Sequence, residues 1–471
     1  MTSYEAVVVG SGPNGLAAAI ALTGSGHSVL VVESAPTPGG GARTAELTLP
    51  GCRHDVCSAV HPFGVASPFF RSLPLEKHGL RWIHHPIPMA HPLDDGAAVL
   101  LQSSLDATAD SLGGDGPAYR RWVGNVVRHW DDLESLLMGP LLRMPRHPIA
   151  AATFGLPALL PATRFARLAF RTHRARALFA GAAAHAIQPL ERPATASFGL
   201  VFLAAGHKHG WPIAAGGSQM ITTALVDHLR SLGGEVVVGT QVRNLTDLPP
   251  SKAILFDTSP AGMERIVGDR FNEAFRRKLR RFRYGPGAFK VDLALDGPVP
   301  WANPSVGRAG TVHLGGTLDQ VAASERGADV ERHFVLLAQP TGADPTRAPA
   351  GKHIVWAYCH VPPSSTLDMT AAIEGQIERF APGFSRLILA RHARDPKGFE
   401  SYNPNYVGGD IAAGAATLMQ LVRRPVLSAD PYATPDPTIF LCSSSTPPGP
   451  GVHGMCGYHA AQSALKRLRS R

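Results

Sequence analysis

Three glycines near the start of the sequence stand at a spacing that can hold a phosphate group. They follow an apolar run at residues 6–9 and precede an alanine-rich segment. The spacing G-x-G-x-x-G allows a tight turn, a close backbone approach to a pyrophosphate and close packing of a helix on a strand. A helix that begins there points free N–H groups at the anion. The predicted phosphate-binding residues are Gly10, Gly12, Pro13, Asn14 and Gly15.

An acidic residue completes this pattern. A second apolar run at residues 27–32 ends at Glu33, 18 residues after Gly15. A carboxylate at that place accepts hydrogen bonds from a ribose hydroxyl, and it would repel the 2′-phosphate of NADP. The pattern therefore predicts a dinucleotide site, but by itself it does not separate NAD from FAD.

The segment after Glu33 separates the two cofactors. Gly39, Gly40 and Gly41 precede Arg43 and Thr44. This juxtaposition resembles the second fingerprint of FAD-dependent oxidoreductases related to amine oxidases and bacterial phytoene desaturases, in which the glycines and the arginine run along the extended FAD. An arginine there can neutralise pyrophosphate charge that the helix dipole leaves over. The alternative for Arg43 is a surface ion pair.

A glycine-proline loop near the C-terminus can serve the other end of a flavin. It leads into a helix predicted from Met455 onward, with Gly451 and Gly454 close to its start. Those glycines would leave the first N–H groups of the helix uncovered, which suits negative charge on the N1 and C2 carbonyl side of a reduced flavin. The alternative is an ordinary C-terminal helix capped by a glycine loop.

The elements that position these residues predict an α/β fold, with a Rossmann-like FAD-binding domain and an inserted α+β substrate domain. FAD-domain segments are expected at residues 1–66, 216–261 and 405–471, and the substrate domain at 67–215 and 262–404. The first insertion has mostly helical periodicity after an initial extended part. In the second, runs at 289–295, 333–337 and 353–358 predict an antiparallel sheet, followed by an amphipathic helix at 370–380.

Composition and charge limit the partners. The 471 residues carry a formal net charge of +9, but no block of lysine and arginine with interleaved aromatics appears, so nucleic acid is disfavoured. No apolar run reaches 18 residues, and the chain runs into its first strand without a charged leader. We expect a cytoplasmic protein. Five scattered cysteines do not form a disulfide framework.

A resemblance to a known family extends from end to end. The stretches "PGCRHDVCSAVHPFGVASPFF", "GWPIAAGGSQM", "NPNYVGGDIAAGA" and "SSSTPPGPGVHGMCGYHAA" resemble the phytoene desaturase-like flavoproteins, above all the branch called pyridine nucleotide-disulfide oxidoreductase domain-containing protein 2. The resemblance implies a non-covalent FAD that takes a hydride or its equivalent from a C–H bond of an apolar, often isoprenoid substrate. Desaturation and redox-neutral isomerisation of a polyene are both open.

The resemblance also implies particular contacts, and a missing motif limits the electron acceptor. Val242 would contact the adenine through its backbone, and Ser443 lies in a serine run where the family places a glycine near the flavin. No second G-x-G-x-x-G for a nicotinamide appears in the middle of the chain, so a reduced flavin would pass its electrons to oxygen, a quinone or another acceptor. The branch is not tied to one known reaction, and the oligomeric state stays open.

Three rival functions are weighed against this one. Cys52 and Cys57 have the C-x4-C spacing of flavin disulfide reductases, but a Pro-Gly turn lies before them where that chemistry needs a helix start. A flavin amine oxidase would need an aromatic cage near the C-terminus, where only Tyr458 is available. The third rival is a protein that binds FAD but acts in interaction rather than catalysis.

Candidates for acid-base catalysis, metal and membrane contact are fewer. His61 and Asp410 could act as acid or base, although a structural role is the simpler interpretation of each. Histidines such as His84, His85 and His91 lack a carboxylate or cysteine at ligand spacing, so we expect no metal. The arginines of residues 164–174 would lie on one face of a single helix, which could dock on anionic lipid and admit an apolar substrate, or form a solvated basic face. These arginines are Arg164, Arg167, Arg171 and Arg174.

Overall fold

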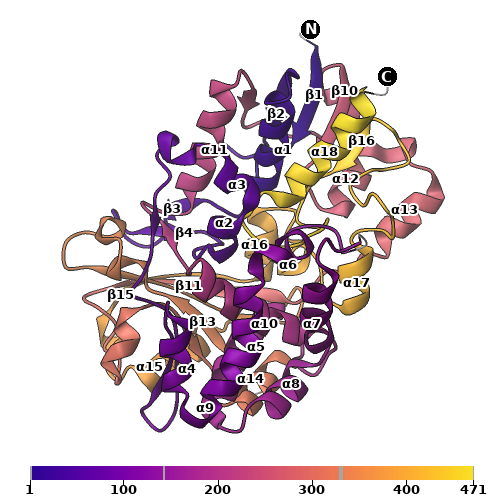
Figure 1. Ribbon diagram of the computed structural model, residues 1–471. Helices are drawn as coiled ribbons and strands as arrows, with labels where there is room; N and C mark the ends of the chain where they lie inside the picture. Colours follow the sequence, from indigo (N-terminus) through magenta and orange to yellow (C-terminus); the bar gives the residue numbers. More distant parts are fainter. Residues whose placement is uncertain (1–2, 142–143, 328–331, 470–471) are drawn as a thin grey trace.

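The computed structural model describes residues 3–141, 144–327 and 332–469. A parallel sheet with helices on both faces forms one part, and a larger sheet beside a layer of helices forms the other (Figure 1). The first strand and the last helix lie together in the upper part of the view. The predicted α/β class with a Rossmann-like domain is confirmed.

The parallel sheet collects strands from distant parts of the chain. Its order is β16-β10-β1-β2-β9, and each neighbouring pair is parallel. Because all five strands run the same way, their carboxyl ends share one edge, where ligands bind in open α/β sheets. The strands are β1 (Tyr4–Val9), β2 (Val29–Val32), β9 (Glu235–Val237), β10 (Ser251–Phe256) and β16 (Ile439–Leu441).

Alternation along β1 covers both faces of this sheet. Ala6 and Val8 belong to the core that contains α1 (Pro13–Thr23), α11 (Gln219–Ser231) and α18 (Met455–Arg469). Val7 and Val9 face the opposite core, with α12 (Pro260–Val267) and α13 (Glu273–Arg280). Successive side chains of a strand point to opposite faces, so a strand buried on both faces appears in the sequence as an unbroken apolar run.

The second sheet has seven strands, in the order β15-β11-β14-β13-β12-β6-β7. All pairs are antiparallel except β12 with β6. Helix α15 (Thr370–Phe380) packs on one face. The strands are β6 (Ile87–Pro92), β7 (Ala98–Leu101), β11 (Gly287–Leu295), β12 (Ala309–Leu314), β13 (Val335–Ala338), β14 (His353–Val361) and β15 (Ile388–Arg394).

The predicted strands of the second insertion and its amphipathic helix are confirmed, but the sheet is larger than expected. Strands β12 and β15 were not predicted. Strands β6 and β7 come from the first insertion and join the sheet through β12. The boundaries between the FAD-binding and substrate domains stay a prediction.

The first insertion is mostly helical after its extended start, as predicted. Helix α10 packs against α5, α7, α8 and α9 in the lower part of Figure 1. The helices are α4 (Leu105–Ser111), α5 (Gly116–Arg128), α6 (Trp130–Leu137), α7 (Pro148–Ala158), α8 (Ala162–Ala169), α9 (His173–Ala183) and α10 (Thr195–Lys208).

Shorter elements complete the fold. They are β3 (Thr44–Glu46), β4 (Arg53–Asp55), α2 (Pro62–Ala66), α3 (Pro68–Ser72), β5 (Trp82–Ile83), β8 (Ile213–Ala214), α14 (Leu318–Glu325), α16 (Pro396–Tyr402) and α17 (Leu418–Arg423).

The single helix expected at residues 164–174 is wrong. Phe170 has extended backbone angles and a buried ring, and it ends α8, while Thr172 caps α9 through its side chain. Arg164 and Arg167 therefore lie on a different helix from Arg174. Leu168, expected off the basic face, is 72% exposed beside these arginines. The burial of Phe170 outweighs the helical periodicity of the arginines.

Among the described residues no single helix is long and apolar enough to cross a membrane. Helices α7 and α8 reach that length and composition only together, and the chain bends by 101° between them.

Candidate functional site

A cavity of about 1040 Å³ runs from the carboxyl edge of the parallel sheet to the helical layer. One end is lined by the glycine-rich turn after β1 and by residues that follow β2 and β10. The other end is lined by apolar side chains of α6, α7 and α10 and by β14. We call these the nucleotide end and the apolar end.

The glycines of the first turn take the roles expected of them. Gly10 has a φ of +102°, and Gly12 is the N-cap of α1 without any side chain to cap it. A β-carbon on Gly15 would lie 2.2 Å from the carbonyl oxygen of Gly10. Gly15 therefore permits the helix to pack on the strand, while Gly10, Gly12, Pro13 and Asn14 line the cavity.

Glu33 and Arg43 lie at the same end and contact each other. Glu33 accepts hydrogen bonds from the backbone and hydroxyl of Ser11, at 2.9 and 2.6 Å, and from the amide of Ala35 at 2.8 Å. The Arg43 guanidinium is 3.4 Å from Glu33 and donates to the carbonyl of Thr37 at 2.8 Å. Both side chains are buried and line the cavity, so Arg43 is not a surface ion pair.

Asp257 is a residue of this end that the motif analysis did not select. It follows β10, and its Oδ2 accepts the amide N–H of Gly15 at 2.9 Å. Burial, together with the nearby Glu33, raises the pKa of Asp257 to about 7. Because β10 is parallel to β1, the residue that follows β10 lies next to the glycine turn that follows β1. The place of Asp257 directly after an apolar strand could therefore have indicated this contact.

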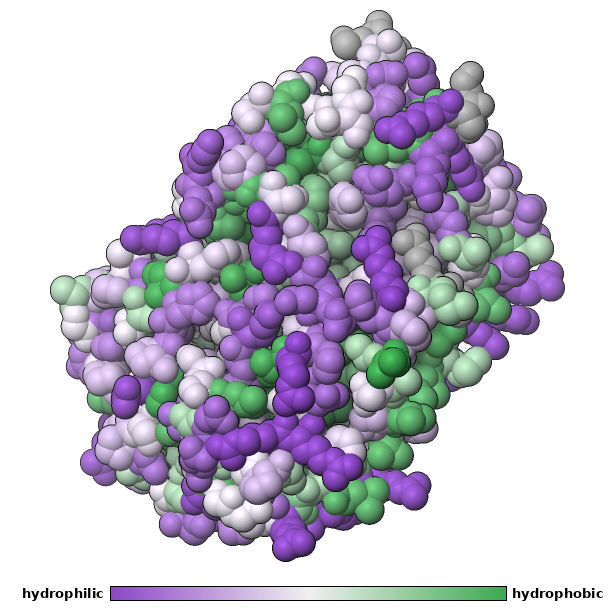
Figure 2. Space-filling model, viewed as in Figure 1, coloured by the Kyte–Doolittle hydropathy of each residue, from purple (hydrophilic) through white to green (hydrophobic). Residues whose placement is uncertain are grey.

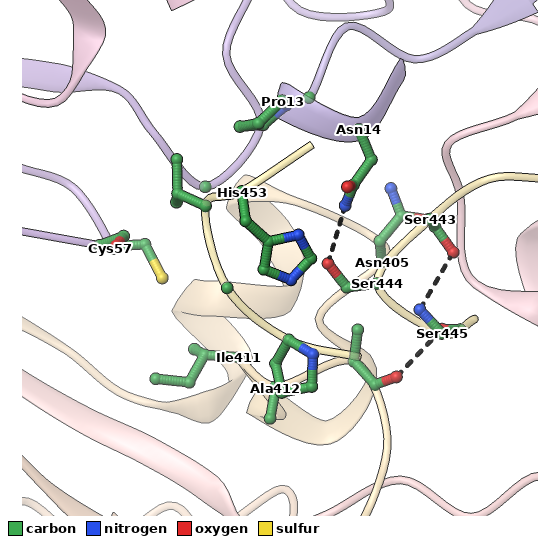
Figure 3. Close-up of a pocket in the computed structure, with 18 of the residues that line it drawn as sticks. Pro13, Asn14, Cys57, Asn405, Ile411, Ala412, Ser443, Ser444, Ser445 and His453 are labelled. Carbon is green, nitrogen blue, oxygen red and sulfur yellow. Dashed lines mark hydrogen bonds between the residues drawn. The ribbon is translucent and has the colours of Figure 1, made fainter. Parts of the chain in front are cut away.

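The serine run in the loop after β16 lies beside Asn14 of the glycine turn, as Figure 3 shows. Asn14 donates to the hydroxyl of Ser444 at 3.1 Å, which ties the glycine turn to the serine run. The Oδ1 of Asn14 is buried and has no partner. Arg424 stabilises this loop by donating to the carbonyl of Ser444 at 3.1 Å. It also donates to the carbonyl of Ala413, in the segment before β16, at 2.8 Å.

The start of α18 differs from the expectation. Gly451 lines the cavity, but Gly454 and Met455 do not. The amide of Met455 donates to Nδ1 of His453 at 3.0 Å, so the first N–H of the helix is already paired. His453 faces the cavity in Figure 3, and burial lowers its pKa to about 4, so its ring is neutral at pH 7. Gly454 instead makes room for Phe70 and Ala17.

Of the remaining predicted cofactor residues, some line the cavity and one does not. Thr44 does not line the cavity. Its hydroxyl donates to the carboxylate of Asp55 and accepts the amide N–H of Gln219. The predicted residues that line the nucleotide end or the adjoining wall are Gly40, Gly41, Val242 and Ser443.

His61 and Asp410 have unequal standing as catalytic candidates. Nε2 of His61 lies 2.8 Å from the hydroxyl of Ser218, which itself donates to the carbonyl of Ser58 at 2.6 Å. Ser218 therefore accepts from Nε2–H, and the buried Nδ1 of His61 has no partner. His61 lines the cavity. Asp410 does not, since it accepts the amides of Gly285, Ala412 and Gly414 and shapes the loop there.

The two cysteines expected of a disulfide reductase are separated. Cys57 lines the cavity, whereas Cys52 packs with Ala294, Ala348 and Ile354 in another cluster. Both are free and buried, and burial raises the pKa of each thiol. A redox pair against a flavin needs both sulfurs at one place, so this arrangement disfavours it. Within the described ranges, no three His, Cys, Asp or Glu residues are grouped as metal ligands.

The apolar end was not predicted from individual residues. Trp356 and Tyr358 stand on one face of β14 with ring centroids 5.0 Å apart, and both line the cavity. Tyr458, the aromatic residue weighed for an amine oxidase cage, instead packs on Phe69. Other apolar lining residues are Leu136, Leu137, Phe154, Ala158, Val201 and Phe202.

Acidic side chains are confined to one end of this cavity. Among the described lining residues, only Glu33 and Asp257 are acidic, and both lie at the nucleotide end. At the apolar end His185 stacks on Phe202 with ring centroids 4.2 Å apart, and burial lowers its pKa to about 3. The apolar end therefore offers neutral surroundings at pH 7.

The nucleotide end fits an extended dinucleotide by the chemistry of its donors. Gly40 and Gly41 form a cradle, since a β-carbon on Gly41 would lie 2.4 Å from the Tyr406 hydroxyl and one on Gly40 would lie 3.1 Å from Cα of Gly12. Glu33 can accept from a ribose, and the buried Oδ1 of Asn14 is still unpaired.

Comparison with known proteins agrees with this geometry. Residues 8–73 match the family described as NAD(P)-binding Rossmann-like domain. The rat pyridine nucleotide-disulfide oxidoreductase domain-containing protein 2 is 24% identical, and the alignment covers 99% of this chain and 94% of that protein. The hydroxyneurosporene desaturase of Cereibacter sphaeroides is 25% identical, with 99% of this chain and 98% of that protein covered. Over nearly its whole length the chain is similar to phytoene desaturase-like oxidoreductases.

A solved structure shares the fold of this oxidoreductase. An engineered variant of putrescine oxidase superposes with a TM-score of 0.65 at 16% identity, covering 100% of this chain and 99% of that one. At this identity the likeness concerns the fold alone. The relatives confirm the predicted resemblance and support an enzyme of the oxidoreductase class.

Proposed function

We propose that this oxidoreductase binds FAD and acts on C–H or C=C bonds of a hydrophobic substrate of isoprenoid or polyene type, as a desaturase or an isomerase. One observation carries the proposal: a single cavity joins a nucleotide end to an apolar end that lacks acidic side chains among the described lining residues. FAD, when bound, supplies the redox chemistry, and the protein supplies binding, orientation and a dry pocket.

The chain's own residues divide this work. Gly10, Gly12 and the start of α1 would hold the pyrophosphate, Glu33 would accept from the ribose, and Arg43 would balance negative charge. His453 and Cys57 lie on the wall between the two ends. The apolar side chains exclude water from the reacting bond. Oxygen or a quinone is the proposed electron acceptor.

A flavin amine oxidase is the second candidate, because the Trp356 and Tyr358 rings face the cavity together. Aromatic faces attract a cation. Yet a protonated diamine also needs a counter-charge where it is buried, and both acidic lining residues lie at the nucleotide end. An apolar substrate has no such requirement.

Binding of FAD is tested at Gly12. A β-carbon there would lie 2.4 Å from Oδ2 of Asp257, so Gly12→Val forces the turn or the carboxylate to move. We expect the purified variant to be colourless while the wild-type protein shows the visible absorbance of flavin. Gly375→Ala is the matched control, since nothing lies within 4 Å of its added carbon. A fully coloured Gly12→Val variant would contradict the placement of the pyrophosphate.

The substrate class is tested by anaerobic bleaching of the bound flavin. We expect a polyene or isoprenoid hydrocarbon to bleach it under conditions in which putrescine does not. Bleaching by the diamine alone would favour the amine oxidase. An isomerase would convert the polyene without net bleaching, and analysis of the products detects that case.

A further inference from the structure

Helices α7 and α8 expose an unusual amount of apolar surface. Ile149 is 80% exposed, Leu156 75%, Leu159 51% and Leu168 72%. Figure 2 shows hydrophobic residues gathered along the lower right of the molecule, where Figure 1 places α7 and α8. A surface helix normally turns charged residues to water, but no charged residue occurs from 148 to 163. We call residues 148–169 the apolar hairpin.

Arginine is the dominant charged residue in the sequence around the apolar hairpin. The sequence from 135 to 190 contains seven arginines and neither aspartate nor glutamate. Arg146 and Arg171 are exposed on either side of the hairpin, and Arg164 and Arg167 are exposed on its α8 segment. Arg167 pairs with the exposed Asp319. Exposed apolar side chains bordered by arginines complement a surface that is apolar inside and anionic outside, as a bilayer of acidic lipids is.

The inner side of the same helix lines the cavity. Phe154 and Ala158 are buried and face its apolar end. Leu159 lines the cavity and is also half exposed, and so is Leu141, at 41%. The exposed apolar surface and the apolar end therefore meet at a common rim.

The length of the hairpin decides how it meets lipid. Helix α7 has 11 residues, or about 16 Å at ~1.5 Å per residue, which is half of the ~30 Å hydrocarbon core. The 101° bend to α8 prevents the two helices from adding their lengths in one direction. Such helices lie in the interface rather than across it.

We propose that the apolar hairpin seats the protein on an anionic lipid surface and places the rim of the cavity against the acyl chains. The inference rests on the proposed function only for the passage of an apolar substrate from lipid to cavity. Binding to lipid itself needs neither substrate nor turnover. The proposed docking surface has an apolar centre and takes the place of the arginine helix expected at residues 164–174.

The test is co-sedimentation of the full chain, supplied with FAD, with vesicles of known composition. We expect binding to vesicles of phosphatidylcholine with phosphatidylglycerol, and weaker binding to phosphatidylcholine alone or at high salt. The double variant Ile149→Ser/Leu156→Ser should bind the vesicles at least about tenfold more weakly, because two exposed apolar side chains no longer enter the lipid. Arg146→Gln/Arg164→Gln should reduce the preference for anionic vesicles.

Leu367→Ser is the matched control, because Leu367 is 63% exposed but lies outside the hairpin. It should bind vesicles like the wild type. Unchanged thermal unfolding of the double variant excludes loss of the fold, since the altered side chains are at the surface. Wild-type protein that ignores both vesicle types, or a double variant that binds like the wild type, overturns the proposal.

Two further outcomes are decisive. If the wild-type protein forms a dimer without lipid and the double variant does not, the hairpin is an interface between copies and the proposal is wrong. If vesicle binding occurs as expected in protein that takes up no FAD, the docking surface stands and the proposed function fails. The two conclusions are thus separable.

Discussion

The carboxyl of Asp257 competes with any phosphate for the start of α1. It already accepts the amide of Gly15 and is buried beside Glu33. Its pKa of about 7 in the folded protein is well above the usual value of an aspartate side chain. The folded state therefore keeps the proton over a range of pH in which the unfolded chain has lost it. Stability should fall as pH rises from about 4 to about 7.

This residue gives a prediction with a defined sign. Asp257→Asn keeps an acceptor for Gly15 but does not titrate, so the fall in stability between about pH 4 and 7 should flatten. The slope for one proton is at most about 1.4 kcal/mol per pH unit. FAD affinity of the wild type should weaken as pH rises through about 7, because an ionised Asp257 repels the pyrophosphate, and the variant should lack this dependence.

Urea unfolding and fluorescence titration with FAD at several pH values measure both effects. Equal pH profiles of wild type and Asp257→Asn would show that another group titrates. Glu33 is the neighbour to replace next, since its negative charge contributes to the raised pKa of Asp257.

At the scale of elements, α1 and α18 cross at Gly457 of α18, which has no room for a side chain. A β-carbon on Gly457 of α18 would lie 1.7 Å from the carbonyl oxygen of Asn14. Gly457→Ala must push the helices apart, at a cost of about 1–3 kcal/mol for overpacking. Because Asn14 also lines the nucleotide end, FAD should bind more weakly to this variant.

The urea midpoint and the FAD dissociation constant test this crossing. Gly375→Ala in α15 is the control, because its added carbon meets nothing within 4 Å and alanine favours a helix by about 0.5–1 kcal/mol over glycine. A Gly457→Ala variant as stable as this control would refute the close approach of the two helices.

The same scale explains what the sequence could predict. Strand β1, helix α1 and strand β2 follow each other within 32 residues, so glycine spacing and apolar runs suffice for the nucleotide end. The apolar end joins Trp356 and Tyr358 of β14 with Phe154 of α7, about 200 residues away in the sequence, and no local pattern reports such a contact. The sequence could not show that the N–H of Met455, expected to be free at the start of α18, is paired by the side chain of His453.

For the whole molecule, the arrangement of two parts around one cavity implies separable functions. The nucleotide end is built from the parallel sheet and the loops at its carboxyl edge, and the apolar end from the helical layer and β14. The apolar hairpin belongs to the second part alone. A change in the helical layer should therefore alter the use of substrate without altering the hold on the cofactor.

Helix α7 allows this separation to be tested with two changes of equal size. Ala158 is 5% exposed and lines the apolar end, whereas Ala152 lies on the exposed face of the same helix. Ala158→Phe should fill the apolar end and slow anaerobic bleaching of the flavin by an apolar substrate by about tenfold or more, through overpacking against the substrate. Ala152→Phe should bleach at the wild-type rate, with substrate supplied in detergent micelles so that lipid docking plays no part.

Both variants should bind FAD like the wild type, because neither position touches the nucleotide end. Loss of flavin from Ala158→Phe, or an unchanged bleaching rate, would mean that the two ends do not work as one site.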